Sequence, residues 1–328
     1  MSEPRAHRQV APTHPSRSVA SSDSALPGFR PDDAFIVFAH AVLRREAAVL
    51  AGNKPQNASS PTPEEIHQLR VAARRLRVAL RLFGRMLPSK NAVRFKAELK
   101  WFAGSLGDVR DLDVYADNFK EYVQTLRPGQ RGALSGYQLY LRRERAEARQ
   151  EAAVTVGSTR AAALLDDLAQ FVVPGPSTAA LRRWGSLSVR DAMRRDIRRS
   201  VGRVRRLGNQ LTVRARPAEL HDLRIKAKRL RYELEFFADV YPPLKQTAKE
   251  CKALQELLGT HQDVYAATAR LRRYAVLLRK QGGDGVLPPA LAQVRKDQLA
   301  LARDVRRSFR AKWPAFVAAI EAARKLVA

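Results

Sequence analysis

The chain has 328 residues, which is enough for two domains or one large duplicated domain. Because 45% of the residues are apolar, the chain can bury a sizeable core and is not a disordered basic tail. Its 60 lysines and arginines outnumber its 32 acidic residues and give a formal charge of +28, which favours anionic partners such as nucleic acid, polyphosphate or acidic membranes. The single cysteine excludes an internal disulfide, and no apolar run approaches the ~18 residues of a membrane span.

Residues 1–30 are rich in serine, proline and arginine. They lack the apolar core of a secretory signal, so we expect a disordered basic arm, with an organelle transit peptide as the alternative. A cytoplasmic location follows by default.

From residue 31 onward the pattern predicts an all-α protein. Apolar residues recur three and four positions apart, and glycines and prolines, including Gly107, Gly259 and Pro314, separate the stretches. No convincing alternating strand pattern is present. We therefore expect a helix to end near each of these residues.

One helical segment occurs twice. Residues 65–77 recur as residues 219–231, 154 positions later. Thr62, Pro63 and Glu65 predict a capping box at the first start, whereas Arg216 occupies the cap position of the second copy, which should begin less firmly. We place the halves at 31–173 and 177–328. Duplication predicts two helical bundles related by a pseudo-twofold axis, with a shared cleft.

Each copy carries a stripe of cations on one helix face. At roughly 100° per residue the stripes consist of His67, Arg70, Arg74, Arg77 and Arg81, and of His221, Arg224, Lys228 and Arg231. Apolar seams on both sides of each stripe predict neighbouring helices on both sides. Because unpaired arginines cannot be buried dry, the cations should line a wet groove or pore. Structural ion pairs are the alternative, especially in the second helix, where Glu233, Glu235 and Asp239 follow.

A second cationic helix is predicted over 182–206. Four arginines lie beside its apolar face and could line the same groove, namely Arg190, Arg194, Arg198 and Arg205. Arg195, Arg199 and Arg206 should face solvent. Arg44 matches Arg198 in the first half, but His40 and Ile36 replace Arg194 and Arg190. The groove should therefore be unequally charged.

The chemistry of the stripes suits phosphate. Cations about 5–6 Å apart along a helix match a flexible phosphate chain, and arginine can bind phosphate oxygens bidentately. His67 lies in the first helical turn, where a neutral imidazole can donate to a bound anion. A capping or packing histidine is the alternative.

At this point the chain resembles the CHAD family, the histidine-containing α-helical domain. The resemblance rests on His67-x-x-Arg70-Val71-x-x-Arg74-Arg75-Leu76-Arg77, on residues 99–102 and 106–114, on His221-x-x-Arg224-x-x-x-Lys228-Arg229-Leu230-Arg231 and on residues 254–259. It implies two four-helix-type bundles around a basic central pore, binding of inorganic polyphosphate and association with polyphosphate granules. The contacts carried over are His67, Arg70, Arg74, Arg77, His221, Arg224, Lys228 and Arg231, with Lys100 and Lys252 as additions.

The second half departs from the family pattern. In the alignment of the two repeats, Gln262 corresponds to Arg110, which is a further candidate contact, and Tyr265 corresponds to Asp113. Some relatives carry a triphosphatase domain marked by Glu-x-Glu-x-Lys. Here the nearest match, Glu233-Leu234-Glu235, lacks the lysine.

We therefore predict a non-catalytic polyphosphate-binding protein with no cofactor, no metal and no membrane partner. One alternative is a metal-binding or phosphoryl-accepting protein that uses His67, His221, His261 and the cluster Asp108, Asp111 and Asp113. These acids follow Gly107, and at a helix start they would stabilise the dipole without a metal. The other alternative is nonspecific nucleic-acid binding by the outer arginines, although aromatics are only 7% and no stacking platform is evident.

Overall fold

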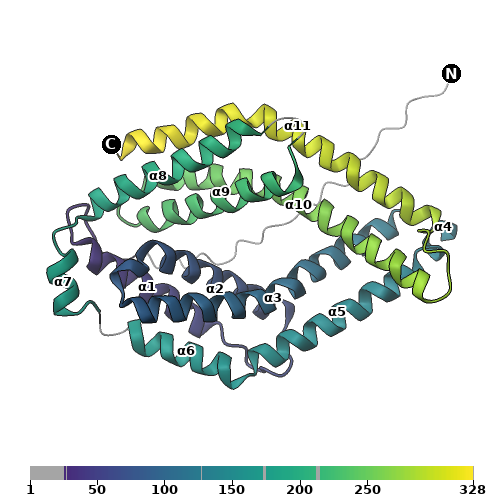
Figure 1. Cartoon of the computed structure of the whole chain (residues 1–328), viewed down its shortest axis with the longest axis horizontal. Coiled ribbons are helices and arrows are strands. Elements are labelled where there is room, and N and C mark those ends of the chain that lie inside the picture. Colours follow the sequence, from purple (N-terminus) through teal and green to yellow (C-terminus); the bar gives the residue numbers. More distant parts are fainter. Residues whose placement is uncertain (1–25, 27, 127, 173–174, 212–214, 328) are drawn as a thin grey trace.

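A computed structural model describes residues 26, 28–126, 128–172, 175–211 and 215–327 (Figure 1). Within them the secondary structure is helical, apart from one isolated bridge between Ala34 and Ser188. In chain order the elements are α1 (Phe35–Gly52), α2 (Pro63–Phe83), the 3-10 helix η1 (Gly84–Met86), α3 (Ser89–Gln124), α4 (Pro128–Gly132), α5 (Ser135–Val156), α6 (Thr159–Val172), α7 (Thr178–Trp184), α8 (Val189–Gln210), α9 (Pro217–Phe237), α10 (Leu244–Lys280) and α11 (Pro289–Leu326).

The predicted all-α class is confirmed. The predicted arm, residues 1–30, lies almost wholly outside the described residues. Within the described part of the chain, no helix is long and apolar enough to cross a membrane.

The sequence repeat appears as a repeat of helix contacts. In the first half α1 packs on α2 and α2 on α3, and in the second half α8 packs on α9 and α9 on α10 (Figure 1). The fourth place is filled by α11, which contacts α10 and α8, whereas in the first half α5 contacts α3 and α6 contacts α1. The two halves are thus similar bundles. The single long helix α11 of the second half takes the place that α5 and α6 share in the first half. The pseudo-twofold axis and the limits of the halves stay predictions.

The two halves share one large apolar core. Five phenylalanines meet where α1, α2 and α9 come together; they are Phe35, Phe38, Phe83, Phe236 and Phe237. The rings of Phe38 and Phe237 lie 5.9 Å apart, and those of Phe83 and Phe236 lie 6.0 Å apart. Because these contacts cross between the halves, α2 and α9 are held against each other from the core side.

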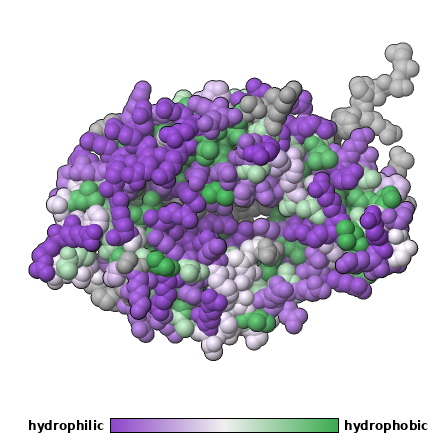
Figure 2. Space-filling model, in the orientation of Figure 1, coloured by the Kyte–Doolittle hydropathy of each residue, from purple (hydrophilic) through white to green (hydrophobic). Residues whose placement is uncertain are grey.

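A second apolar cluster joins the far ends of the long helices. It takes residues from α3, α5, α10 and α11, and its centre is aromatic: the Tyr115 and Tyr137 hydroxyls lie 2.9 Å apart, and the Tyr137 and Tyr274 rings 5.1 Å apart. The halves are therefore joined at two places. Between them Figure 2 shows a hollow in the middle of the molecule, bordered largely by hydrophilic residues.

The long helices differ from the prediction. Gly107 lies inside the 36-residue α3, Gly259 inside the 37-residue α10 and Pro314 inside the 38-residue α11, although all three were expected to separate helices. A glycine within a helix costs only about 1 kcal/mol relative to alanine, which packing along both sides of a long helix can offset. Tertiary contacts therefore decided the helix lengths.

The predicted start of α2 is confirmed. The Thr62 hydroxyl accepts a hydrogen bond from the Glu65 backbone N–H at 3.2 Å, and the Glu65 carboxylate accepts one from the Thr62 N–H at 2.7 Å. At α9 only the second bond recurs, between the Glu219 carboxylate and the Arg216 N–H at 2.6 Å, with no side-chain cap from Arg216. Half of the capping box is thus retained there.

We expect Thr62→Ala to lower the thermal unfolding midpoint by about 2 °C, because it removes the cap of the helix that carries the first cation stripe. Thr62→Ser keeps the hydroxyl and serves as the control. Scanning calorimetry checks the difference, and equal midpoints for the alanine variant and the original chain would contradict it.

Candidate functional site

The two cation stripes face each other across the contact between α2 and α9. Arg70 and Arg74 from α2 and Arg224 and Lys228 from α9 are all half-buried. We call these four residues the central cation cluster. Lys228 is close enough to Arg74, Arg224 and Arg70 for their charges to act on it. The structure therefore brings together cations that are far apart in the sequence.

The cluster is electrostatically strained. Burial, and then the charges of Arg74, Arg224, Arg70 and Arg231, lower the pKa of Lys228 to about 6. Burial followed by the charge of Arg74 also lowers the pKa of Arg70. Like charges held in one place destabilise the unliganded protein, and a bound anion relieves that cost.

The interactions within the cluster are reciprocal. Arg70 acts on Lys228, and the corresponding pair in the repeat, Arg224 and Arg74, also interacts. Arg74 and Lys228 occupy equivalent positions and interact with each other. The pairing is what two copies of the same helix would make on meeting face to face.

Few carboxylates neutralise the cluster. Asp111 pairs with Arg70 at 2.7 Å, but the aspartate is 61% exposed, so solvent screens the pair. Asp263, the counterpart of Asp111, is the leading opposite charge on Arg224. The structure thus supplies one exposed acid to each half of the cluster.

Both stripe histidines lie beside the cluster in the first turns of their helices. Burial, and then the charge of Arg110, lower the pKa of His67. The Nδ1 atoms of His67 and His221 are buried and have no hydrogen-bond partner among the described residues. The lowered pKa favours the neutral ring of His67, and a neutral imidazole offers one donor and one acceptor for hydrogen bonds.

The remaining predicted residues fall into two groups. Arg77 and Arg81 continue the stripe on α2. The charge of each contributes to lowering the pKa of Arg229 on α9. Arg231 continues the stripe on α9 and pairs with Glu235 at 3.5 Å, as the alternative of internal ion pairs anticipated.

The other group does not join the cluster. Arg190 pairs with Asp32 at 3.1 Å, and Arg194 donates to the Val327 carbonyl oxygen at 3.0 Å. Arg198 follows one turn later and is exposed, as are Arg44, Lys100 and Lys252, the last of which lies 3.9 Å from Glu256. The expectation that the α8 arginines share the groove stays a prediction, and the partners of Arg190 and Arg194 lie at residue 32 and near the end of the described chain.

The expected acidic helix start also needs correction. Gly107 lies inside α3, so the acids after it do not cap a helix. Asp111 pairs with Arg70, and buried Asp113 pairs with Arg145 at 2.5 Å and with Arg149 at 3.0 Å. The Asp108 side chain is outside the described residues, and among those described no group of three or more histidine, cysteine or acidic side chains could hold a metal.

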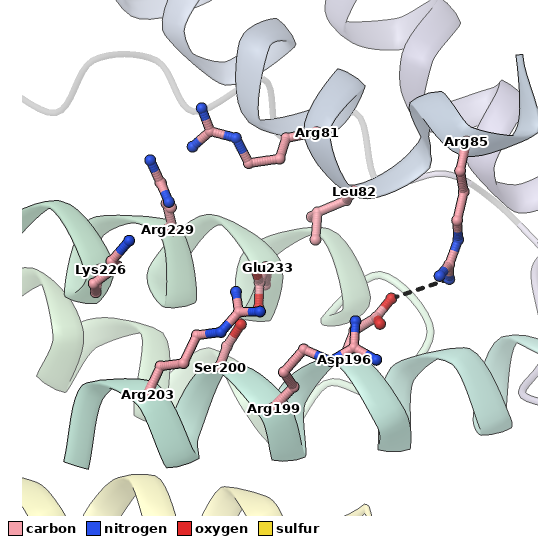
Figure 3. Close-up of a pocket in the computed structure, with 10 residues that line it drawn as sticks. All are labelled: Arg81, Leu82, Arg85, Asp196, Arg199, Ser200, Arg203, Lys226, Arg229 and Glu233. Carbon is pink, nitrogen blue, oxygen red and sulfur yellow. Dashed lines mark ion pairs between the residues drawn. The ribbon is translucent and has the colours of Figure 1, made fainter. Parts of the chain in front are cut away.

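The sequence interpretation missed a second group of cations. A pocket of about 150 Å³ lies between α2, η1, α8 and α9 and is lined by Arg81, Arg85, Arg199, Arg203, Lys226 and Arg229 together with Leu82, Asp196, Ser200 and Glu233 (Figure 3). Lys226, Arg229 and Glu233 form a helical row on α9 that is turned away from the α9 stripe of His221, Arg224, Lys228 and Arg231. Their spacing of three and four was the available signal.

The lowered pKa of Lys228 predicts proton uptake on binding. At pH 8.5 the free amine is mostly neutral, and a bound polyanion should raise its pKa toward the ordinary value of 10.5, so about one proton enters per complex. Between pH 6 and pH 10 the affinity for polyphosphate should therefore fall as the pH rises. The free energy of unfolding of the free protein should rise over the same range, because Lys228 keeps a proton in the unfolded chain that it lacks in the folded one.

Calorimetric titration with polyphosphate in buffers of different ionisation enthalpy measures that proton. Lys228→Arg is the control, because arginine stays protonated and should take up none. A binding heat that does not vary with the buffer would contradict the prediction.

Comparisons with known proteins agree with this architecture. The CHAD domain family model matches residues 41–272, which is more than half of the chain. Two uncharacterized proteins of Mycobacterium tuberculosis, from strains CDC 1551 and H37Rv, are each 27% identical over 231 residues, covering 67% of this chain. The chain spans only 42% of the length of these relatives.

Two solved structures share the fold. The CHAD domain from the plant Ricinus communis is 25% identical with a TM-score of 0.63, over 92% of this chain and 94% of that one. PptA from Streptomyces chartreusis is 19% identical with a TM-score of 0.67, over 86% and 99%. With the repeated histidine-led cation helix and the helical architecture, the family match over residues 41–272 establishes that this chain belongs to the CHAD domain family.

Proposed function

We propose that this protein binds inorganic polyphosphate, without catalysis, along the cation stripes of α2 and α9. The observation that carries the proposal is Lys228, a half-buried amine surrounded by the charges of Arg70, Arg74, Arg224 and Arg231. Such a site is unfavourable when empty and needs a ligand with several closely spaced negative charges. Polyphosphate meets this need, because it carries a charge on every unit of a flexible chain.

The position of the cluster supports a single flexible chain over a duplex. The cations are half-buried between two packed helices, so a narrow ligand reaches them more readily than a double helix does. The four residues of the central cation cluster are among those that the family resemblance assigns to phosphate on α2 and α9, and His67 and His221 lie beside them. A cytoplasmic protein associated with polyphosphate granules is the physiological setting we propose.

Nonspecific nucleic-acid binding is the second candidate, and the formal charge of +28 together with exposed arginines on α8 favours it. That binding would depend on total charge and fall steeply with salt. It would not require the central cation cluster.

Binding titrations at about 150 mM salt separate the two candidates. Long polyphosphate, tripolyphosphate, single-stranded RNA and duplex DNA are each titrated into the full chain by calorimetry. We expect long polyphosphate to bind most tightly, with no release of orthophosphate over hours. Equal affinity for duplex DNA would overturn the polyphosphate proposal, and release of phosphate would overturn its non-catalytic part.

A further inference from the structure

The pocket between α2, α8 and α9 has an excess of positive charge. Five of its cations form no salt bridge among the described residues: Arg81, Arg199, Arg203, Lys226 and Arg229. Of its two acids, Asp196 is already paired with Arg195 at 3.0 Å and with Arg85 at 3.6 Å. Figure 3 shows Arg81 on α2 and Arg229 on α9 facing the pocket from the two halves.

The cations in the pocket act on one another. Burial, and then the charge of Arg81, lower the pKa of Arg229, and burial followed by Arg229 and Arg203 lowers that of Lys226. The second acid, Glu233, is only 7% exposed, and its Oε2 atom has no hydrogen-bond partner. The pocket thus presents several cations and one unsatisfied buried oxygen to a ligand.

Glu233 is only partly ionised near neutral pH. Burial, and then the charge of Asp196, raise its pKa to about 7, while Ser200, Arg203 and Arg229 oppose the shift. In its protonated form the carboxyl group can donate a hydrogen bond to a phosphate oxygen. The acid therefore does not prevent anion binding.

The pocket continues the stripe of α2. Arg229 interacts with both Arg77 and Arg81, and Arg77 interacts with Arg74 of the central cation cluster. A phosphate chain lying on the cluster can follow these arginines and arrive at the pocket. Arg77, Arg81 and Arg229 thus connect the central cation cluster to the pocket by a row of positive charges.

The equivalent place at the other end of the stripes is occupied by ion pairs. At the positions equivalent to Arg81, Ser200 and Arg85 stand Glu235, Glu46 and Asp239. These three acids bind Arg45 and Arg75: Glu46 contacts Arg75 at 2.8 Å, Glu235 contacts Arg75 at 3.0 Å, and Asp239 pairs with Arg45. We call these five residues the interhelix ion network. The same structural position holds one more acid than cations at one end and is strongly cationic at the other.

The ends of a phosphate chain differ chemically from its interior. An interior unit carries one negative charge, whereas a terminal phosphate takes a second charge with a pKa near 6. A cavity of about 150 Å³ is large enough to admit a phosphate group, and a chain end bound there would place both of its terminal charges among the pocket's cations.

We propose that this pocket binds the terminal phosphate of a polyphosphate chain, so that the chain lies on the two stripes in one direction only. The inference rests on the proposed function. Beyond polyphosphate binding itself, the inference states that the protein recognises the free end of the phosphate chain. This recognition takes place only where the stripes end at Arg81 and Arg229.

The test compares long polyphosphate with free ends against the same chains with both ends blocked as phosphoramidates. The full chain should bind free-ended polyphosphate about tenfold more tightly, since one or two charge-assisted hydrogen bonds are lost on blocking. Arg203→Gln with Lys226→Gln should abolish this difference, and it should weaken the binding of blocked chains no more than the matched control pair does. The matched control, Arg206→Gln with Arg310→Gln, removes the same charge from exposed positions outside the pocket and should keep the difference.

A second measurement does not depend on any variant. Titrating the unaltered protein into tripolyphosphate and observing phosphorus NMR should shift the terminal signals more than the central one. Equal affinities for free and blocked chains would overturn the end-binding inference while leaving polyphosphate binding intact. Failure to bind either kind of chain would overturn the proposed function itself.

Discussion

Replacing Arg74 and Lys228 together by glutamine should weaken the binding of long polyphosphate by about a hundredfold or more. These two residues occupy equivalent positions in the repeat and meet at the centre of the cation cluster. Each contributes charge-assisted contacts to a phosphate chain, and the loss of both also interrupts the stripes at their middle.

The free double variant should be at least as stable as the original protein. Arg74 acts on Lys228 and on Arg224 as a like charge, so its neutralisation removes repulsion. Calorimetric titration gives the affinity, and thermal unfolding confirms that the fold is kept. The pair Arg206→Gln and Arg310→Gln again provides the control, and equal losses in both variants would show that total charge alone governs binding.

The second large effect is expected at Glu46. Its side chain is fully buried and accepts hydrogen bonds from Arg75 at 2.8 and 3.1 Å and from Arg45 at 3.2 Å. Burial alone would lower the pKa of Arg75, but the hydrogen bonds and charge of Glu46, together with the charge of Glu235, raise it. Glu46 therefore compensates two guanidinium groups that lie between the halves.

We expect Glu46→Ala to lower the free energy of unfolding by about 3–5 kcal/mol, because it leaves two largely buried cations short of a partner. Glu46→Gln keeps the volume of the side chain but not its charge, and it should lower the free energy of unfolding by less. Glu121→Ala removes an exposed carboxylate and should change little. Urea unfolding measures all three, and a loss below about 1 kcal/mol in the alanine variant would show that Glu235 and Asp239 suffice.

Much of the central cluster could be predicted from the sequence. The stripe Arg70, Arg74 and its copy Arg224, Lys228 follow from helical spacing, and the repeat shows that they occur twice. Apolar residues on both sides of each stripe indicated flanking helices, which α2 and α9 have. These inferences concern local periodicity and burial, which a sequence records directly.

The exact helix lengths and the partners of individual charges were not predictable in the same way. Gly107 and Gly259 looked like helix ends but lie within α3 and α10, because contacts along those helices outweigh a local cost of about 1 kcal/mol each. Arg190 and Arg194 looked like neighbours of the cluster, yet their partners are Asp32 and the Val327 carbonyl, at the start and the end of the described chain.

The sequence by itself determined the all-α class, the repeat, the capped start of α2 and the two rows of cations, because each depends on the spacing of nearby residues. Only the tertiary structure decided which cations are neutralised. The interhelix ion network and the cationic pocket occupy equivalent positions in the repeat, and they differ because the charges that meet there come from α1, α2, α8 and α9. Coulomb interactions depend on distances between side chains, which the order of residues along the chain does not reveal until the helices have packed.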